Sequence, residues 1–397
     1  MVADSMILNN DFDLKKYEFP TGSCRPGRKV IKNKIHYTYT VNNISSFADT
    51  INVILQRMKL CKKIPHQLWY RGHADSKYVL LPTLLREYTA SAHESSSLIE
   101  YHRSNIEDFL IKSHGASELQ QHRGVLYKNA LIEYIAEMQH YRVPTNLLDW
   151  SENPFVSLYF ACENVIQRKE TLNGTVYVLN PHLYNVTRAH IIKQFLKLSG
   201  NHKTSEQKRN EETIISKGNL LPYMGVPYNI ESDHLRDFVY GPDISTLFPE
   251  KDRVQTNPLD EYRTYQDMSD RKPIYAPLFP IAIQVPRTTP RMQSQSGTFV
   301  AFNLCTQPTQ GDERFLGFSH VELEEIQKFY LECDNIDCLD VGQESKGVKV
   351  PFLYRIDLKQ EHPSEFSEFL EAIAITEEKL YPELYRIGAK IQRSNPL

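Results

Sequence analysis

The stretch LYKNALIEYIAEMQHYRVPTNLLDWSENPFVSLYFACENVI, residues 126–166, carries the clearest structural pattern in the chain. Apolar residues recur three or four positions apart before and after a polar interruption, as on the buried face of an amphipathic helix. Asn153 followed by Pro154 is typical of a helix start, with the asparagine as N-cap. The two apolar stripes are Leu131, Ile135 and Met138, and Phe155, Leu158, Tyr159 and Cys162. The pattern therefore predicts two helices joined by a polar loop.

Shorter patterns on both sides predict further elements. Residues 41–60 predict an amphipathic helix, Pro82 opens a short helix, and residues 67–70 predict a short strand that stops at Gly72. Four later segments also predict strands: TVYVLN at 175–180, PIAIQV at 280–285, GTFVAFN at 297–303 and FLYRIDL at 352–358. Regular crossover helices do not separate these strands. The predicted fold class is therefore α+β: one mixed, mostly antiparallel small sheet with helices packed around it.

The chain divides into an arm and one domain. Residues 1–40 are polar and rich in turn formers, which predicts an N-terminal arm. Residues 41–397 form the expected domain. Within it, the segment at about 181–272 is charged and irregular, so we expect a long insertion there rather than a second core.

Composition excludes several classes of protein. Of the 397 residues, 41% are hydrophobic and 24% charged, close to a globular average, and the net charge of −3 makes bulk nucleic-acid binding unlikely. No apolar run reaches the ~20 residues of a membrane span, and the first residues lack a signal-peptide pattern. The six cysteines are scattered, and Cys333 and Cys338 have no second pair or nearby histidine to complete a zinc site. We therefore expect a cytoplasmic protein with reduced thiols, no membrane association and no metal.

The first segment with chemical potential is Tyr70-Arg71-Gly72. An arginine at the end of a buried strand presents a rigid fork of donors that suits a phosphate or a carboxylate. Gly72 lets the chain turn and lets a ligand approach the backbone. The structural alternative is that a buried acid such as Asp149 holds Arg71.

The second segment is the predicted loop from Gln139 to Pro154. Loops on a rigid frame are common positions for functional residues. His140 is a candidate acid, base or hydrogen-bond donor, and Asp149 is a candidate partner of a ribose hydroxyl or of Arg71. Thr145 is a candidate ligand contact, and Trp150 either stacks on a base or fills the core.

A third, weaker segment runs from Arg287 to Phe299. Arg291 and Gln295 precede a glycine and a strand there, which is also what a polar hairpin loop looks like. Motifs of P-loop NTPases, dinucleotide-binding Rossmann domains, nucleophile-elbow hydrolases and zincins are absent from the sequence.

Together these segments resemble the FRG-domain family, which is named after an aromatic-Arg-Gly motif. Here the motif is Tyr70-Arg71-Gly72, followed by Leu80, Leu81, Pro82 and Arg86. The block from Gln139 to Pro154 resembles the family's Q-H-[YF]-G-x-P-T-R-L-L-D-W-T-x-N-P stretch, with Arg142, Asn146 and Ser151 as departures. Two later blocks also resemble family motifs, one from Arg291 to Phe299 and one from Ile375 to Leu384. The resemblance implies an FRG-like domain over residues 41–397 and a place among bacterial anti-phage or toxin-like loci.

The aromatic-Arg-Gly strand end is also similar to the first motif of ADP-ribosyltransferases, in which an arginine binds the phosphate and ribose side of NAD. The Ser-Thr-Ser strand of those enzymes has no clear counterpart, and Gln295 stands where a catalytic glutamate would be sought. Glu322, Glu324 and Glu325 are interpreted as a solvated helix face.

These resemblances imply a toxin-like antiviral effector that uses NAD as substrate, by ADP-ribosyl transfer or by NAD glycohydrolysis. Cleavage of the nicotinamide–ribose bond passes through a cationic ribose, which a nearby carboxylate or amide stabilises. The expected catalytic residues are His140, Asp149 and Gln295. The expected NAD-binding residues are Tyr70, Arg71, Gly72, Thr145, Trp150 and Arg291. Whether the chain is an enzyme stays open. The alternatives are a non-catalytic sensor that recognises a phage protein or a nucleotide, and an RNA-cleaving toxin. The expected partners are NAD or another nucleotide and a phage or host protein as target.

Overall fold

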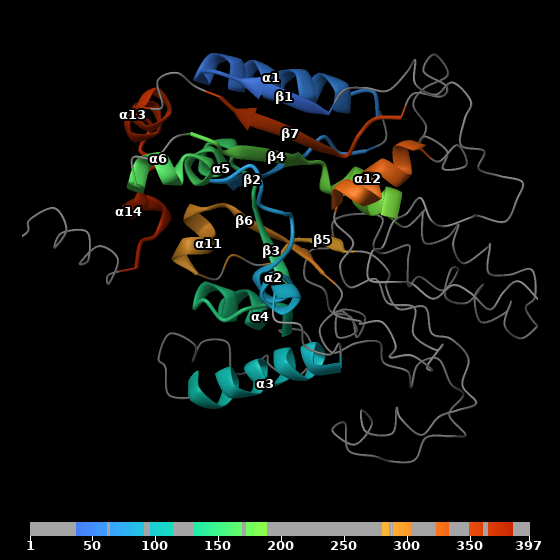
Figure 1. Cartoon of the computed structure of the whole chain (residues 1–397), viewed down its shortest axis with the longest axis vertical. Helices are drawn as coiled ribbons and strands as arrows, with labels where there is room; N and C mark the ends of the chain where they lie inside the picture. Colours follow the sequence, from blue (N-terminus) through green and yellow to red (C-terminus); the bar gives the residue numbers. More distant parts are fainter. Residues whose placement is uncertain are drawn as a thin grey trace, which may run out of the picture.

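The structure is a computed structural model (Figure 1), and it describes residues 37–61, 64–90, 96–113, 131–168, 172–188, 280–285, 287, 289–302, 323–332, 349–359 and 364–383. These residues form a seven-stranded sheet in the order β1-β7-β4-β2-β3-β6-β5. β1 pairs with β7 in parallel, and the other neighbouring strands are antiparallel. The predicted α+β class with one mixed, mostly antiparallel sheet is confirmed. Most of the predicted insertion, residues 189–272, lies outside the described residues.

The strands largely follow the sequence pattern. The predicted ones are β2 (Trp69–His73), β4 (Thr175–Leu179), β5 (Ile281–Ile283), β6 (Gly297–Ala301) and β7 (Leu353–Leu358). β2 continues through Gly72 to His73 instead of stopping at the glycine. β1 (Thr38–Val41) brings the last residues of the expected N-terminal arm into the sheet.

One element was not predicted at all. The segment interpreted as a loop between two helices contains a strand, β3 (Leu147–Ser151), which pairs with β6 along its whole length. The prediction of a loop was wrong because the five residues LLDWS are too short to show a strand period. Cross-strand hydrogen bonds, rather than local propensity, determine this strand.

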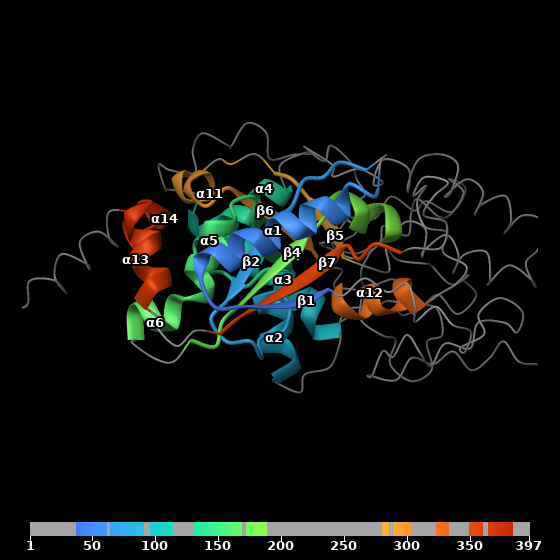
Figure 2. The ribbon, with the colours of Figure 1, turned by 90° about the horizontal axis from the view of Figure 1, so that it is seen from above.

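Helices cover both faces of the sheet (Figures 1 and 2). α1 (Ile44–Met58) has Asn43 as its N-cap, whose side chain accepts from Ser46 N. α5 (Pro154–Ala161) has the predicted cap, because Asn153 Oδ1 accepts from Phe155 N at 2.9 Å. The remaining helices are α2 (Thr83–Ala90), α3 (Ser96–Lys112), α4 (Leu131–His140), α6 (Glu163–Arg168), α11 (Pro290–Ser294), α12 (Leu323–Glu332), α13 (Ser364–Ala372) and α14 (Glu377–Leu380).

The described apolar side chains form a large core and a smaller one. The large core joins α1, α5, α12 and α13 to the central strands. The smaller one joins α4 and α11 to β3, β5 and β6. Residues 181–188, at the expected start of the insertion, are helical and belong to the core. Within them, the side chain of Asn185 binds both the N–H and the carbonyl of Ala282 in β5. Among the described residues, no helix is long and apolar enough to cross a membrane.

Two glycines allow α5 to pack directly on the sheet. A Cβ at Gly72 of β2 would lie 1.9 Å from the carbonyl oxygen of Ser157, and one at Gly174 would lie 2.0 Å from that of Ala161. Both contacts are with helix backbone, which cannot move aside as a side chain can. Gly72 therefore sets the distance between α5 and β2.

We expect Gly72→Ala to destabilise the fold by about 3 kcal/mol or more, since an inserted methyl group in a packed interior forces backbone shifts. Gly297→Ala is the matched control, because its Cβ would meet nothing closer than 3.5 Å. Urea unfolding of both variants measures the difference. Equal stability of the two variants would contradict this role of Gly72.

Candidate functional site

Strand register brings polar side chains of distant segments into one line across the sheet. Arg355 of β7 lies opposite Tyr177 of β4, and Tyr177 lies opposite Arg71 of β2. Between β2 and β3 the paired residues are Tyr70 and Ser151; Arg71 and Trp150 come directly next to that pair on the two strands, and Trp150 pairs with Thr298 of β6. Opposite residues of paired strands share a face of the sheet. We call these five residues the central row: Arg355, Tyr177, Arg71, Trp150 and Thr298.

A second polar line runs beside the central row on the same face. His73 lies opposite Thr175, and Thr175 lies opposite Asp357. The other face of these strands is apolar and buried, with Val176, Val178, Tyr354 and Ile356. The polar side chains of the central strands therefore share one face, where buried apolar residues such as Leu179 and Leu353 accompany them.

Arg71 is a half-buried cation bound by neutral groups. Its Nη1 donates to the backbone oxygen of Asp149 at 2.5 Å, and its Nε donates to Nε2 of His73 at 2.9 Å. Among the described residues, no carboxylate lies within ion-pairing distance of Arg71, so the partner is the Asp149 backbone and not its exposed side chain. Loss of hydration lowers the pKa of Arg71 to about 10, and the guanidinium stays charged at neutral pH.

His73 is held in its neutral form. Nε2 accepts from Arg71, so Nδ1 carries the proton and donates to the carbonyl of Tyr78 at 3.1 Å. Burial, and then the charge of Arg71, lower the pKa of His73 to about 3. His73 was not singled out in the sequence. The sequence feature that could have identified His73 is its position two residues after Arg71 on a strand, which puts both side chains on one face.

At the β7 end of the central row, Arg355 belongs to a network of hydrogen bonds and an ion pair. Arg355 Nε donates to Asp357 Oδ1 at 2.7 Å, and Thr175 Oγ1 donates to the same oxygen at 2.7 Å. Glu324 of α12 is half-buried and hydrogen-bonded to Tyr177, and burial raises the pKa of its carboxyl. The interpretation of Glu324 as part of a solvated face was therefore wrong, because α12 packs on β7. Glu322 and the side chain of Glu325 lie outside the described residues.

Three of the predicted site residues gather elsewhere, around the segment Leu380–Glu383. His140 Nε2 lies 3.6 Å from Glu383 Oε1. Gln295 Nε2 donates to the Leu380 carbonyl at 3.0 Å. Arg291 lies over the ring of Tyr381, 4.5 Å from its centroid. These residues tie α4 and α11 to the C-terminal segment, and none of their described contacts is with Arg71.

The remaining predicted residues have structural contacts. Tyr70 is buried on the face opposite Arg71, and burial raises its pKa to about 12. Thr145 is buried, donates to Gln139 and accepts from Leu147 N. Trp150 is 3% exposed and packs in the core, so its ring face is covered. Their roles in ligand binding stay predictions.

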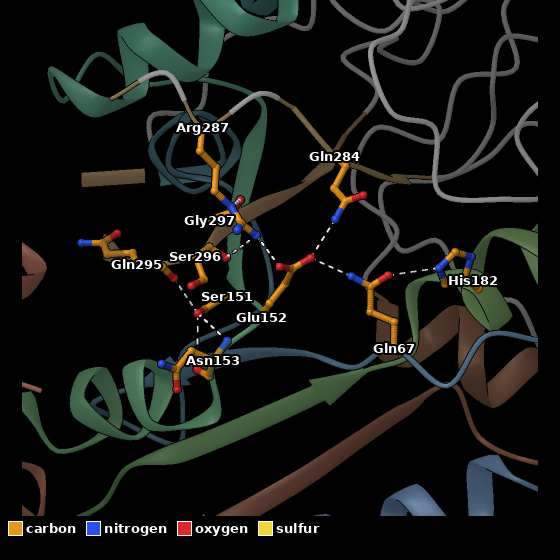
Figure 3. Close-up of polar contacts among 10 residues, drawn as sticks. All are labelled: Gln67, Ser151, Glu152, Asn153, His182, Gln284, Arg287, Gln295, Ser296 and Gly297. Atoms are coloured by element: carbon orange, nitrogen blue, oxygen red, sulfur yellow. Dashed lines mark hydrogen bonds and ion pairs between the residues drawn. The ribbon is translucent and has the colours of Figure 1, made fainter. Parts of the chain in front are cut away.

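A carboxylate that the sequence analysis did not assign accepts hydrogen bonds from three side chains of distant segments (Figure 3). Glu152, just after β3, accepts from Gln67 at 2.6 Å, from Gln284 at 2.7 Å and from Arg287. Gln67 Oε1 also lies 3.2 Å from His182 Nε2. This network fixes the ends of β2, β3 and β5 beside the central row.

Comparison with known proteins identifies part of this architecture. Residues 66–171 match the family model of the FRG domain, so this part of the chain is an FRG domain, as the motifs predicted. The matched residues include β2, β3 and Arg71, but not Arg291, Gln295, Tyr177 or Arg355. No curated protein and no solved structure matches the chain significantly. The match supports a nuclease-like or defence-associated domain, and the use of NAD stays a prediction.

The neutral state of His73 predicts a pH dependence of stability. The pKa of His73 is lowered in the folded chain, so between about pH 6.5 and pH 3 only the unfolded chain binds this proton. The free energy of unfolding should therefore fall with decreasing pH in this window, by up to about 1.4 kcal/mol per pH unit. His73→Gln should remove this contribution, as measured by urea unfolding at several pH values.

The exposed His66 provides the matched control. His66→Gln should leave the pH slope of stability as it is in the wild type. An unchanged slope in His73→Gln would show that His73 is not held neutral.

Proposed function

We propose that the chain is a defence-type effector that binds a nucleotide through Arg71, with NAD as the expected ligand and substrate. The observation that carries this proposal is the half-buried Arg71 guanidinium, which neutral acceptors hold in place while the Asp149 carboxylate acts on it only from beyond ion-pairing distance. Removing a cation from water without a counter-charge in direct contact destabilises a protein. An anionic ligand supplies that charge.

The surroundings of Arg71 favour an anion over a cation. Of the charges that act on Arg71, the Asp149 carboxylate raises its pKa and the weaker effect of Arg86 lowers it, and the positive charge of Arg86 also acts on His73. His73 and the Asp149 carbonyl occupy Nε and Nη1, which fixes the plane of the guanidinium. A pre-oriented guanidinium suits the paired oxygens of a phosphate or pyrophosphate.

For NAD, the proposed reaction is cleavage of the bond between nicotinamide and ribose. Water or an acceptor group bonds to the ribose carbon, and nicotinamide leaves with the electrons of the broken bond. The exposed carboxylate of Asp149 belongs to the residue whose carbonyl Arg71 binds. Asp149 and Trp150 are consecutive on β3 and point to opposite faces, but the charge of the Asp149 carboxylate still acts on Arg71, and we assign it to long-range stabilisation of the cationic ribose.

The second candidate is a nucleotide sensor that does not turn its ligand over. The groups that touch Arg71 are a backbone carbonyl and an imidazole whose pKa is lowered to about 3. These groups position the guanidinium but are poor proton donors or acceptors at neutral pH. That observation favours binding without catalysis. Nicotinamide release distinguishes the two candidates.

Arg71→Ala should reduce affinity for NAD by roughly 30-fold to several thousand-fold, because it removes the anchor of a charged ligand. Calorimetry with purified protein measures affinity, and nicotinamide release measures turnover. Arg142→Ala is the matched control, since Arg142 is exposed and outside the central row. A wild type that neither binds NAD nor releases nicotinamide would refute NAD as the ligand.

If Arg71 serves the fold rather than a ligand, its replacement should strongly lower the free energy of unfolding. Arg71→Met leaves the Asp149 carbonyl and His73 Nε2 without their donor, so its free energy of unfolding should fall by no more than about 1–3 kcal/mol. A loss of several kcal/mol in urea unfolding would assign Arg71 to the fold and not to a ligand.

A further inference from the structure

Two buried polar atoms of the central row, Nε1 of Trp150 and Oγ1 of Thr298, have no hydrogen-bond partner in the described part of the chain. Trp150 is 3% exposed and Thr298 is 0% exposed. The two residues are directly opposite on β3 and β6, which places their Cβ atoms about 5 Å apart. A buried polar group without a partner destabilises the folded chain. Two of them side by side point to a missing ligand.

Their neighbours on the row define the surroundings of these two atoms. On one side, Arg71 of the neighbouring strand β2 is next to the Tyr70–Ser151 pair, as Trp150 is on β3. On the other side, the register of β5 and β6 places Gln284 opposite Thr298. Glu152, two residues after Trp150, accepts from Gln284 Nε2 at 2.7 Å, which leaves Gln284 Oε1 as an acceptor (Figure 3). The two unpartnered atoms therefore lie between a cation and an amide.

We infer that Trp150, Thr298 and Gln284 bind the polar edge of the base or carboxamide in a nucleotide whose phosphates Arg71 holds. This inference rests on the proposed function. The indole is a donor only, the hydroxyl both donates and accepts, and the amide oxygen accepts. Such a set fits an edge that carries donors and acceptors together. None of the three side chains carries a positive charge, so the set does not suit a second phosphate.

The spacing of the strands supports this assignment. Adjacent strands lie about 4.8 Å apart, so Trp150, Thr298 and Gln284 stand about 5, 10 and 14 Å from Arg71 along the row. A nucleoside extends from its phosphate over such a distance. Trp150 then acts through its indole N–H, because its ring packs in the core and is covered.

The test compares inorganic pyrophosphate with NAD on the full-length chain by calorimetry. Thr298→Val should weaken NAD binding about five- to tenfold, the effect of one lost hydrogen bond, and leave pyrophosphate binding unchanged. Its melting temperature should stay the same or rise, since the variant removes an unpartnered hydroxyl and keeps the shape of the side chain. Thr298→Ser keeps the hydroxyl and should bind NAD as the wild type does.

Thr187→Val is the matched control. Thr187 is 1% exposed, and its hydroxyl also has no described partner, but it lies outside the row. Thr187→Val should therefore leave NAD binding unchanged. If Thr298→Val does not fold, Gln284→Met provides the second variant, with the same expected loss of NAD affinity and unchanged pyrophosphate binding.

Three outcomes would overturn the inference. Wild-type affinity for NAD in Thr298→Val would show that the hydroxyl is only an unpartnered core group. A wild type that binds pyrophosphate as tightly as NAD would leave the anion site at Arg71 standing and remove the nucleoside site. A wild type that binds neither probe would refute the proposed function, and this inference with it.

Discussion

The close packing of α5 against β2 and β4 is the constraint on which the rest of the structure depends. At Gly72 and Gly174 the helix backbone occupies the space that a Cβ would need. One face of the central strands is therefore closed by a helix at the shortest possible distance. Side chains alternate between faces along a strand, so Arg71 and His73, on either side of Gly72, must lie on the other face. The contact between the α5 backbone and Gly72 thus determines that Arg71 and His73 point away from α5.

The polar groups of the central row are paired to different degrees from one end of the row to the other. At Arg355 each charge has a partner, because Asp357 and Glu324 balance the guanidinium and Thr175 adds a hydrogen bond. At Arg71 the contacts are neutral, and at Trp150 and Thr298 two polar atoms have no described partner. Native proteins rarely leave such groups buried without a reason. The change from satisfied to unsatisfied groups along the row is the observation from which we propose a ligand near Arg71.

Several features of the site followed from the sequence. The aromatic-Arg-Gly motif at the end of a strand pointed to Arg71, and the FRG-domain match includes that motif. Polar residues in different loops were also expected to lie together with Arg71, and for three of them the described contacts are elsewhere. His140, Arg291 and Gln295 instead contact the segment Leu380–Glu383. Polar residues that bind each other and polar residues that bind a ligand look alike in a sequence.

The sequence by itself determined the local elements: the α4 and α5 stripes, the Asn153 cap, most strands and the α+β class. Those features depend on side-chain periodicity and on caps a few residues long. Only the tertiary structure decided that LLDWS is a strand, that His73 is neutral, and that Arg355, Tyr177, Arg71, Trp150 and Thr298 form one row. The physical reason is that strand register and burial arise from contacts between residues that lie as far apart as Thr38 and Arg355, which no local pattern encodes.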